Sequence, residues 1–320
     1  MNEPKPIPIT RRQWFTATGA AAGSAAAAAI PAGAARTADA MPKFRFCLNM
    51  STIRGQNLSI EKEVDVAGKA GYDAIEPWMG KLGKYVEDGG SLADLGKRIK
   101  DHGLTVESAI GFARWIVDDD AERADGFEAA KRDMGMLAEI GGIRIAAPPA
   151  GAPGDRAIDP MKIAERYGQL LELGEKTGVV PQIEMWGGNR SIGRVSTAIY
   201  IAIECGHPKA CFLGDVFHTY KGGSEFPGLK MLGPQALQVF HFNDYPADPP
   251  QEKIRDQHRV YPGDGIAPIG DILRNFLAVG AAPVLSLEVF NRDYWKQDAL
   301  EVGRTGLRKM KQTVQAATAG

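Results

Sequence analysis

The feature that most constrains this chain is a regular alternation of short apolar runs with longer segments that carry helix signals, starting at Lys43. The expected strands are residues 44–49, 73–78, 105–112, 143–147, 179–186, 210–215, 237–242 and 283–289. The expected helices are residues 59–71, 91–103, 119–140, 159–178, 195–206, 225–232, 269–280 and 296–316. Eight strand–helix alternations predict an α/β fold, a (β/α)₈ TIM barrel that forms a single domain over residues 41–320.

An open, doubly wound α/β sheet is the main alternative to the barrel. Such sheets usually carry a Gly-rich phosphate-binding loop directly after the first strand. Here residues 49–55 read Asn-Met-Ser-Thr-Ile-Arg-Gly, which contains no such loop, and the chain has neither a Walker motif nor a Gly-x-Ser-x-Gly elbow. The missing phosphate loop therefore favours the barrel.

The first forty residues have the pattern of an export signal. Arg11 and Arg12 precede two large apolar residues, an Ala-rich run extends to Ile30, and residues 38–40 (Ala-Asp-Ala) offer a cleavage site. This pattern predicts a twin-arginine-type signal peptide over residues 1–40 and a periplasmic or exported mature protein. The Ala-rich run is too weakly apolar for a stable membrane anchor. A disordered Ala-rich tail is the alternative interpretation.

The charge balance and the cysteines exclude some functions. The formal net charge is −1, so the chain lacks the basic excess of a nucleic-acid-binding protein, and we expect no nucleic-acid partner. Cys47, Cys205 and Cys211 form no Cys-x-x-Cys pair and have apolar neighbours. They are expected to be small buried residues, although a disulfide between Cys205 and Cys211 stays possible.

Four expected strands end in side chains that can bind a metal ion. These side chains are Glu184, Asp215, His241 and Glu288. The C-terminal ends of the strands of a (β/α)₈ barrel meet at one face, where such barrels keep their active sites. Carboxylate oxygens and an imidazole suit one divalent ion, namely Mn, Mg, Co or Zn. The alternatives are structural carboxylates at the barrel mouth and, for His241, a hydrogen-bonded core histidine.

Taken together, these segments resemble the xylose isomerase-like TIM barrels, a group of sugar phosphate isomerases and epimerases. The resemblance covers Lys43 to about Val314 and rests on residues 71–76, 183–184, 214–218, 241–244, 259–265 and 287–288. Within this group, the pattern is most similar to ketose 3-epimerases and hydroxypyruvate isomerases. AP endonucleases also belong to the group, but they need a richer ligand set for three zinc ions than five histidines can supply here.

The resemblance implies roles for residues around the metal. It implies that Glu184, Asp215, His241 and Glu288 bind the metal, and that His218 and Arg259 bind substrate. The spacing from His241 to Arg259 is longer than in ketose 3-epimerases, because residues 245–257 look like an insertion. Further expected substrate-binding residues at strand ends are Asp244, Glu76 and Trp186. Loops 80–90, 148–155 and 245–259 are expected to govern substrate choice.

The expected chemistry is proton transfer next to a carbonyl group through a metal-stabilised enediolate. Glu184 and Glu288 would act as the catalytic acid and base on a small-molecule sugar or keto-sugar. Two alternatives stay open, namely a metal-dependent lyase or hydrolase that acts on 3-keto-glycosides and a sugar-binding barrel without catalysis. A homo-oligomer is possible, and the sequence does not indicate the substrate or the metal.

Overall fold

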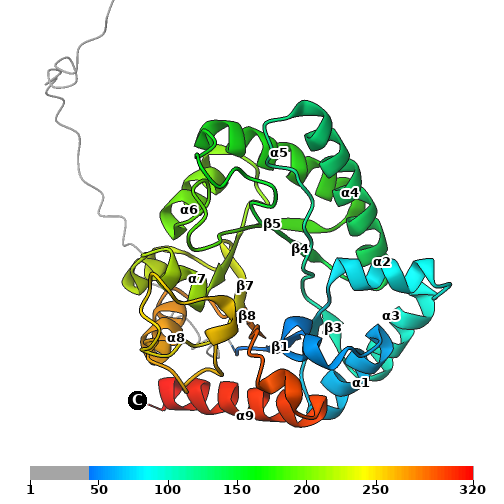
Figure 1. The fold of residues 1–320 in the computed structure, drawn as a ribbon, viewed down its shortest axis with the longest axis vertical. Helices are drawn as coiled ribbons and strands as arrows, with labels where there is room; N and C mark the ends of the chain where they lie inside the picture. Colours follow the sequence, from blue (N-terminus) through cyan, green and yellow to red (C-terminus); the bar gives the residue numbers. More distant parts are fainter. Residues whose placement is uncertain (1–42, 320) are drawn as a thin grey trace, which may run out of the picture. The chain divides into compact units, whose positions relative to one another are not determined.

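The computed structural model describes residues 43–319 and has the expected barrel fold (Figure 1). The strands are β1 (Phe46–Asn49), β2 (Ala74–Glu76), β3 (Thr105–Val106), β4 (Arg144–Ala147), β5 (Val180–Glu184), β6 (Phe212–Asp215), β7 (Leu237–His241) and β8 (Val284–Leu287). They form one sheet in the order β3-β2-β1-β8-β7-β6-β5-β4. A parallel bridge between Val106 and Gly142 joins the two ends of this order and closes the sheet.

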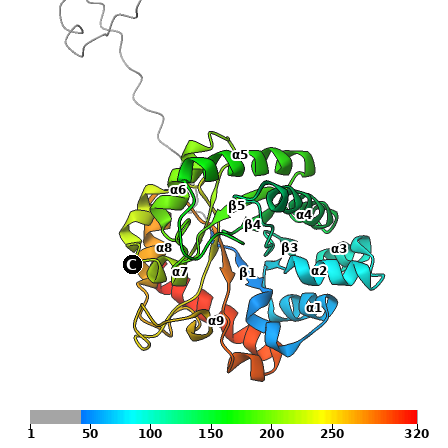
Figure 2. The same cartoon turned by 45° about the horizontal axis from the view of Figure 1, so that its top comes forward.

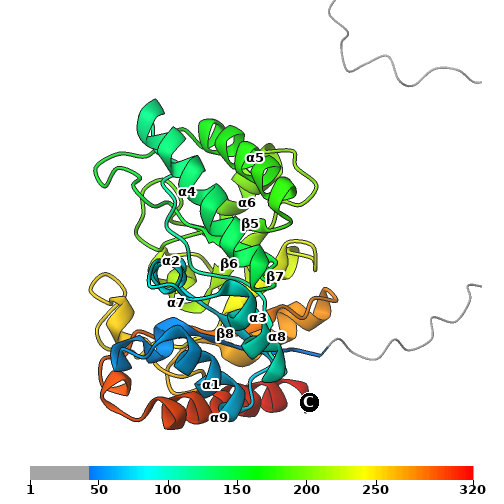
Figure 3. The same cartoon turned by 90° about the vertical axis from the view of Figure 1, so that its right-hand side faces the viewer.

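Helices surround the strands (Figure 2). They are α1 (Ile60–Ala70), α2 (Met79–Glu87), α3 (Leu92–Asp101), α4 (Asp120–Glu139), α5 (Pro160–Thr177), α6 (Val195–Glu204), α7 (Val216–Lys221), α8 (Ile269–Ala278) and α9 (Ala299–Thr318). The last helix, α9, contacts both α1 and α8, so it closes the helical ring (Figure 3). Among residues 43–319, no helix is both long and apolar enough to cross a membrane.

The helix boundaries follow the capping signals of the sequence. The Ser59 hydroxyl accepts a hydrogen bond from the Lys62 backbone N–H at the start of α1. Gly71 ends α1 with φ = 90°, a left-handed conformation that side chains other than glycine rarely adopt. Asp119 and Asp159 cap α4 and α5 in the same way as Ser59, since their carboxylates accept from backbone N–H groups of the first turn.

Three local predictions were wrong, and one lies outside the described residues. Residues 80–90, expected to be a loop, are mostly helix α2, and residues 225–232 contain a 3₁₀-helix (Phe226–Met231). The short helix α7, not expected from the sequence, begins directly after β6. Helices α2 and α7 are both shorter than the stretch of sequence over which helical periodicity can be recognised, so the sequence pattern did not reveal them. The predicted signal peptide, residues 1–40, lies outside the described residues.

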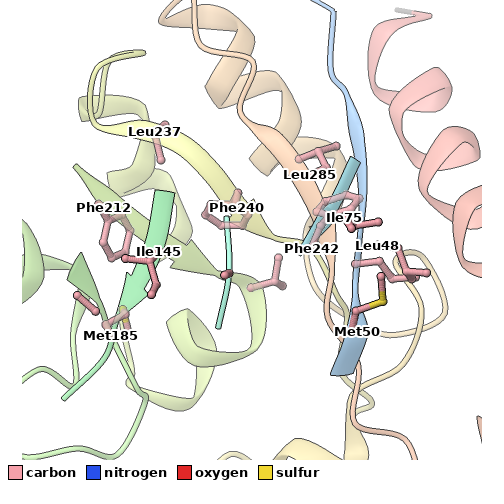
Figure 4. Close-up of a cluster of buried hydrophobic side chains, with 14 of the residues drawn as sticks. Leu48, Met50, Ile75, Ile145, Met185, Phe212, Leu237, Phe240, Phe242 and Leu285 are labelled. Atoms are coloured by element: carbon pink, nitrogen blue, oxygen red, sulfur yellow. The ribbon is translucent and has the colours of Figure 1, made fainter. Parts of the chain in front are cut away.

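Side chains alternate along each strand between the interior of the barrel and the main apolar core outside it. Seven buried side chains, most of them small, form a compact cluster inside the barrel, namely Cys47, Ala74, Ile110, Ala146, Leu213, Val239 and Val284. Larger ones belong to the main apolar core, of which Figure 4 shows Leu48, Ile75, Phe212, Phe240 and Leu285. Because successive residues of a strand point to opposite faces, a residue two positions after an interior residue is also interior. This rule brings the last polar residue of several strands into the barrel mouth.

Candidate metal centre

Three of the four predicted metal ligands come together at the C-terminal ends of β6, β7 and β8. Asp215, His241 and Glu288 each offer one ligand atom, and these atoms lie within 4.8 Å of one another. Asp215 ends β6, His241 ends β7 and Glu288 directly follows β8. All three residues are buried. Two carboxylate oxygens and one imidazole nitrogen are a donor set that fits a divalent cation.

The orientation of the His241 ring favours metal binding through Nδ1. Nε2 lies 3.1 Å from Glu76 Oε2, whereas buried Nδ1 has no hydrogen-bond partner within the described part of the chain. Nδ1 lies 3.2 Å from Glu288 Oε2 and 3.7 Å from Asp215 Oδ2. Burial would lower the pKa of His241, but the carboxylates of Glu288 and Glu76 outweigh it and raise the pKa. The His241 ring thus directs Nδ1, a nitrogen without a hydrogen-bond partner among the described residues, toward Asp215 and Glu288.

Glu76 lies behind His241 and does not line the cavity, which corrects the prediction that it binds substrate. Its Oε2 accepts hydrogen bonds from Asn49 Nδ2 at 2.8 Å and from Ser286 Oγ at 2.6 Å. The side chain is fully buried. Burial would raise the pKa of Glu76, but His241 and these two donors outweigh it and lower the pKa. A charged carboxylate held in this way orients the imidazole that it contacts.

Arg259 contacts two of the three clustered ligands from the cavity side. Its Nη1 donates to Asp215 Oδ2 and to Glu288 Oε2, each at 2.8 Å, and Nη2 donates to Asp256 Oδ1 at 2.5 Å. Burial would raise the pKa of Asp215, but the Arg259 charge outweighs it and lowers the pKa. A 3₁₀-helix (Asp256–His258) directly precedes Arg259 in the long segment that follows β7.

Glu184 lines the same cavity but does not belong to the three-residue cluster. It ends β5 and is 5% exposed. Burial raises the pKa of Glu184 to about 8, and the nearby charge of Glu288 adds to the rise although His241 opposes it. A carboxyl group with such a pKa is a candidate for proton transfer near neutral pH.

His218 lies between the candidate metal ligands and the cavity. It belongs to α7, whose N-terminal residue follows Asp215 directly, and the Asp215 carboxylate accepts from the His218 backbone N–H at 2.9 Å. The two ring nitrogens face two donors, Gly187 N at 3.2 Å from Nδ1 and Arg259 Nη2 at 3.1 Å from Nε2. Burial lowers the pKa of His218, which favours the neutral ring.

The cavity in front of these residues has a volume of about 480 Å³. It is lined by Trp78, Ile110, Phe112, Glu184, Trp186, Gly187, Asn189, His218, Asp256, Arg259, Glu288 and Phe290. Four predicted substrate-side residues are thus on its wall, namely Glu184, Trp186, His218 and Arg259. The size is that of a small-molecule site.

Asp244 does not line this cavity, which corrects a second substrate-binding prediction. Its two carboxylate oxygens accept hydrogen bonds from the backbone N–H groups of Tyr245, Gly263, Gly265 and Ala267, at 2.8 to 3.1 Å. The side chain is fully buried. Asp244 therefore holds together the long segment between β7 and α8, which delivers Arg259 to the site.

Comparison with known proteins identifies the family. The model of the xylose isomerase-like TIM barrel family matches residues 64–313. The chain belongs to the xylose isomerase-like TIM barrel family. It is 26% identical to an inosose isomerase of Bacillus velezensis over 85% of this chain and 96% of that protein. An inosose isomerase of Bacillus licheniformis is 25% identical over 82% of this chain and 94% of that protein.

Solved structures show the same fold as this xylose isomerase-like barrel. A structure of the IolI protein with a bound zinc atom has a TM-score of 0.79 at 23% identity, and the match covers 87% of this chain and all 100% of that chain. A structure of L-ribulose 3-epimerase has a TM-score of 0.70 at 18% identity, with 87% of this chain and 96% of that chain covered.

Sequence reasoning missed several residues of this xylose isomerase-like barrel that complete the site. Asn49 and Ser286 hold Glu76, and Asn243 Nδ2 donates to Asp215 at 3.3 Å. Asn49 is the last residue of β1, in register with Glu76 of β2. Its position at a strand end is the signal that could have found it, since neighbouring strand ends share the barrel mouth.

Proposed function

We propose that this protein is a divalent-metal-dependent isomerase or epimerase that moves a proton next to the carbonyl group of a sugar or a sugar-like ketone. The observation that carries the proposal is the buried cluster of Asp215, His241 and Glu288, with an unused His241 Nδ1, on one wall of a cavity that also contains Glu184. The similarity to inosose isomerases along nearly their whole length supports the reaction class.

The metal site has a defined role in this proposal. Asp215 and Glu288 would hold the ion through carboxylate oxygens and His241 through Nδ1, while Glu184 stands at the edge of the site. A divalent ion bound there supplies Lewis acidity to the substrate carbonyl, which acidifies the neighbouring C–H bond. The zinc atom in the similar IolI structure supports zinc among the candidates Mn, Mg, Co and Zn.

Glu184 and Glu288 are the proposed proton-transfer residues. They come from the ends of β5 and β8, and β6 and β7 lie between these strands in the sheet, so the two carboxyl groups approach the cavity from different sides. One removes the proton, and the other returns it either to the opposite face of the same carbon or to the adjacent carbon. The first outcome is epimerisation and the second is isomerisation.

His218 and Arg259 are proposed to bind the oxygen atoms of the substrate. Both line the cavity next to Glu288. Arg259 is a permanently charged donor whose guanidinium already contacts Asp215 and Glu288. Its charge would favour the negative charge that develops on a substrate oxygen during proton removal.

Exchange of substrate protons with solvent deuterium tests the proposed function. The purified chain, loaded separately with Mn²⁺, Co²⁺, Mg²⁺ and Zn²⁺, is incubated in D₂O with 2-keto-myo-inositol, D-fructose and L-ribulose, and the C–H signals next to the carbonyl are followed by NMR. We expect exchange with at least one ketone. We expect Glu184→Gln to slow it by about 10² to 10⁴-fold, because one proton-transfer group is lost.

Gly135→Ala serves as the matched control, because position 135 lies on α4 with open space around it, and it should exchange at the wild-type rate. Metal content is measured for every variant, so that loss of the ion is separated from loss of the base. Absence of exchange with all three ketones in metal-loaded protein, or wild-type exchange in both Glu184→Gln and Glu288→Gln, would reject the proposal.

A further inference from the structure

A second cavity lies between helices α2 and α4, apart from the cavity at the metal centre. The two helices contact each other on the outside of the barrel (Figure 1), and the cavity between them has a volume of about 580 Å³. Residues 112–114, which follow β3, also line it. This size is that of a small-molecule site, and none of the proposed metal-binding or proton-transfer residues contributes to its wall.

Two glycines of α2 leave room for this cavity. Gly80 and Gly83 both line it. A Cβ atom at Gly80 would meet nothing within 4 Å, and one at Gly83 would meet only the terminal methyl group of Met136, at 4.0 Å. Glycine is unfavourable in the interior of a helix. The open space at Gly83 therefore lowers the stability of α2, and a larger side chain there would enter the cavity.

Large apolar side chains line the cavity on three sides. They are Met79 of α2, Met136 of α4 and Phe112. Phe112 is 46% exposed although it packs beside the rings of Trp78 and Trp186, so much of its surface is accessible to a ligand. Methionine side chains adapt to ligands of different shapes and make favourable contacts with aromatic groups. These three side chains suit the apolar part of a small molecule.

Asp133 of α4 places a half-buried carboxyl group in these apolar surroundings. It lines the cavity and also borders a small internal space whose other lining residues, such as Met134 and Ile145, are apolar. Within residues 43–319, its carboxylate has no hydrogen-bond or ion-pair partner. Burial raises the pKa of Asp133 from 3.8 to about 6, although the charge of Arg132 opposes the rise. A carboxylate in such a position is unfavourable until a donor or a cation pairs with it.

The other charges around the cavity favour a cation over an anion. Arg114 and Glu122 pair with each other at 2.9 Å, and Lys84 pairs at 2.9 Å with Asp88, which does not line the cavity. The lining charges that have no ion pair in the described part of the chain are three carboxylates and one guanidinium, namely Glu87, Asp125, Asp133 and Arg132. This excess of negative charge is complementary to a positively charged molecule.

We propose that the cavity between α2 and α4 is a binding site for an organic ammonium ion with an apolar body. The ammonium group pairs with the Asp133 carboxylate, and the apolar body lies against Met79, Met136 and Phe112. This site goes beyond the proposed function and does not depend on it, because Asp133 and both methionines lie outside the cavity at the metal centre.

Three probes of related structure test the site. 2-Phenylethylammonium carries both features, 2-phenylethanol has the same apolar body without the charge, and ethylammonium has the charge without the ring. Their Kd values are measured by titration calorimetry with the purified, metal-loaded chain at pH 8, above the pKa of about 6 of Asp133. We expect 2-phenylethylammonium to bind at least about tenfold more tightly than either of the others, because each of these lacks one of the two contacts.

Asp133→Asn should weaken the binding of 2-phenylethylammonium about tenfold or more and leave the Kd of 2-phenylethanol unchanged. The substitution removes a half-buried charge that has no partner among the described residues, so it should not impair folding, and urea unfolding checks this. Glu128→Gln is the matched control, because Glu128 is exposed on the same helix and does not line the cavity. It removes the same charge and should keep the wild-type preference.

Gly83→Leu tests whether the probe binds in this cavity. A leucine side chain at position 83 would extend toward Met136 and fill part of the space, so we expect the binding of 2-phenylethylammonium to weaken at least about tenfold. Gly135→Leu is the control, since position 135 has open space around it and does not line the cavity. A probe bound to the carboxylates of the metal centre would be unaffected by either substitution, because neither glycine lines that cavity.

Four results would overturn the inference. They are absence of binding of 2-phenylethylammonium, equal affinity for 2-phenylethylammonium and 2-phenylethanol, a charge preference that persists in Asp133→Asn, and wild-type binding in Gly83→Leu. Each of these can occur while the chain still exchanges ketone protons with deuterium. The ammonium site and the proposed isomerase or epimerase function can therefore be rejected separately.

Discussion

At the scale of single residues, the site depends on groups that never reach the cavity. Glu76 illustrates this, because within residues 43–319 its side chain has hydrogen-bond partners in Asn49, Ser286 and His241. It keeps Nε2 of His241 engaged, and the opposite nitrogen, Nδ1, then faces Asp215 and Glu288. The charge and the position of one buried carboxylate therefore decide which nitrogen is available to a metal ion.

Replacing Glu76 with Gln should weaken metal binding without unfolding the barrel. The amide is nearly isosteric but lacks the charge that orients the His241 ring, so we expect the affinity for Zn²⁺ to fall about 10- to 100-fold. Competition with a chromophoric chelator measures this affinity. An affinity equal to that of the wild type would show that Glu76 has no part in orienting the ring.

Asp244→Asn provides the contrast to Glu76→Gln. Asp244 is also fully buried, but its four backbone partners lie in the segment from Tyr245 to Ala267. An Asn side chain would point its NH₂ group at two of these backbone N–H donors, which would then lose their acceptor. We therefore expect a loss of about 3 kcal/mol in the free energy of unfolding. The affinity of the folded variant for Zn²⁺ should stay close to that of the wild type.

Glu63 on α1 lies away from the candidate metal ligands, and its ionisation is expected to make the stability of the fold depend on pH. Its side chain is 1% exposed, pairs with Lys81 through Oε1, and has no partner at Oε2 within the described residues. Burial raises the pKa of Glu63 from 4.5 to about 7, against the opposing effect of Lys81. The folded protein therefore binds this proton more tightly than the unfolded chain does, and stability decreases as the pH rises from about 4.5 to about 7.

Glu63→Gln should remove this part of the pH dependence, because the amide does not ionise. Between pH 5 and pH 8, we expect the free energy of unfolding of the wild type to fall by roughly 2 to 3 kcal/mol more than that of the variant. Urea unfolding at both pH values measures the difference. Parallel pH profiles for the two proteins would contradict the raised pKa.

At the scale of elements, a glycine in a helix either permits a close approach to a neighbouring segment or has open space around it. Helix α4 shows both situations. At Gly126, a Cβ atom would lie 2.6 Å from the carbonyl carbon and oxygen of Arg114, whereas at Gly135 it would meet nothing within 4 Å. Gly126 thus lets α4 pack against the segment after Phe112, while Gly135 has no such packing role.

Alanine substitutions at these two glycines should have opposite effects on stability. Gly126→Ala forces the helix away from a rigid backbone, and we expect a loss of about 1 to 3 kcal/mol. Gly135→Ala removes the entropic cost of glycine in a helix interior, and we expect a gain of about 0.5 to 1 kcal/mol. Thermal and urea unfolding compare both with the wild type, and effects of the same sign would contradict this account of α4.

At the scale of the whole molecule, the barrel closes through contacts between chain segments that are distant in sequence. Helix α9 packs beside α1 and α8, and β1 pairs with β8. Eight strand ends thereby converge at one mouth, where residues from Asn49 to Phe290 share a single site. We propose in addition that residues 1–40 act as a twin-arginine signal and that the barrel is exported.

Export makes a specific prediction about the mature N-terminus. When the full-length chain is expressed in a bacterium with a twin-arginine pathway, we expect the periplasmic fraction to contain a protein that begins near Met41, as determined by mass spectrometry. Replacing Arg11 and Arg12 together with Lys should leave the uncleaved chain in the cytoplasm. An intact Met1 in the cytoplasm of wild-type cells, with no periplasmic form, would rule out the signal.

Local patterns in the sequence were sufficient to predict the barrel and the strand ends that bring Asp215, His241 and Glu288 together. Apolar runs and capping residues are short-range signals, so they locate strands and helices even though their three-dimensional arrangement is unknown. The rule that strand ends meet at one face of such a barrel then brings together Asp215, His241 and Glu288. The same rule places Glu184 on the cavity wall, although not in the cluster.

Only the tertiary structure decided which way the remaining side chains point. Glu76 and Asp244 also stand at strand ends, yet Glu76 supports His241 and Asp244 binds a loop backbone. Arg259 reaches the site from the long segment after β7, and Phe112 lies beside the rings of Trp78 and Trp186. These roles depend on partners far away in the sequence, and no local pattern contains that information.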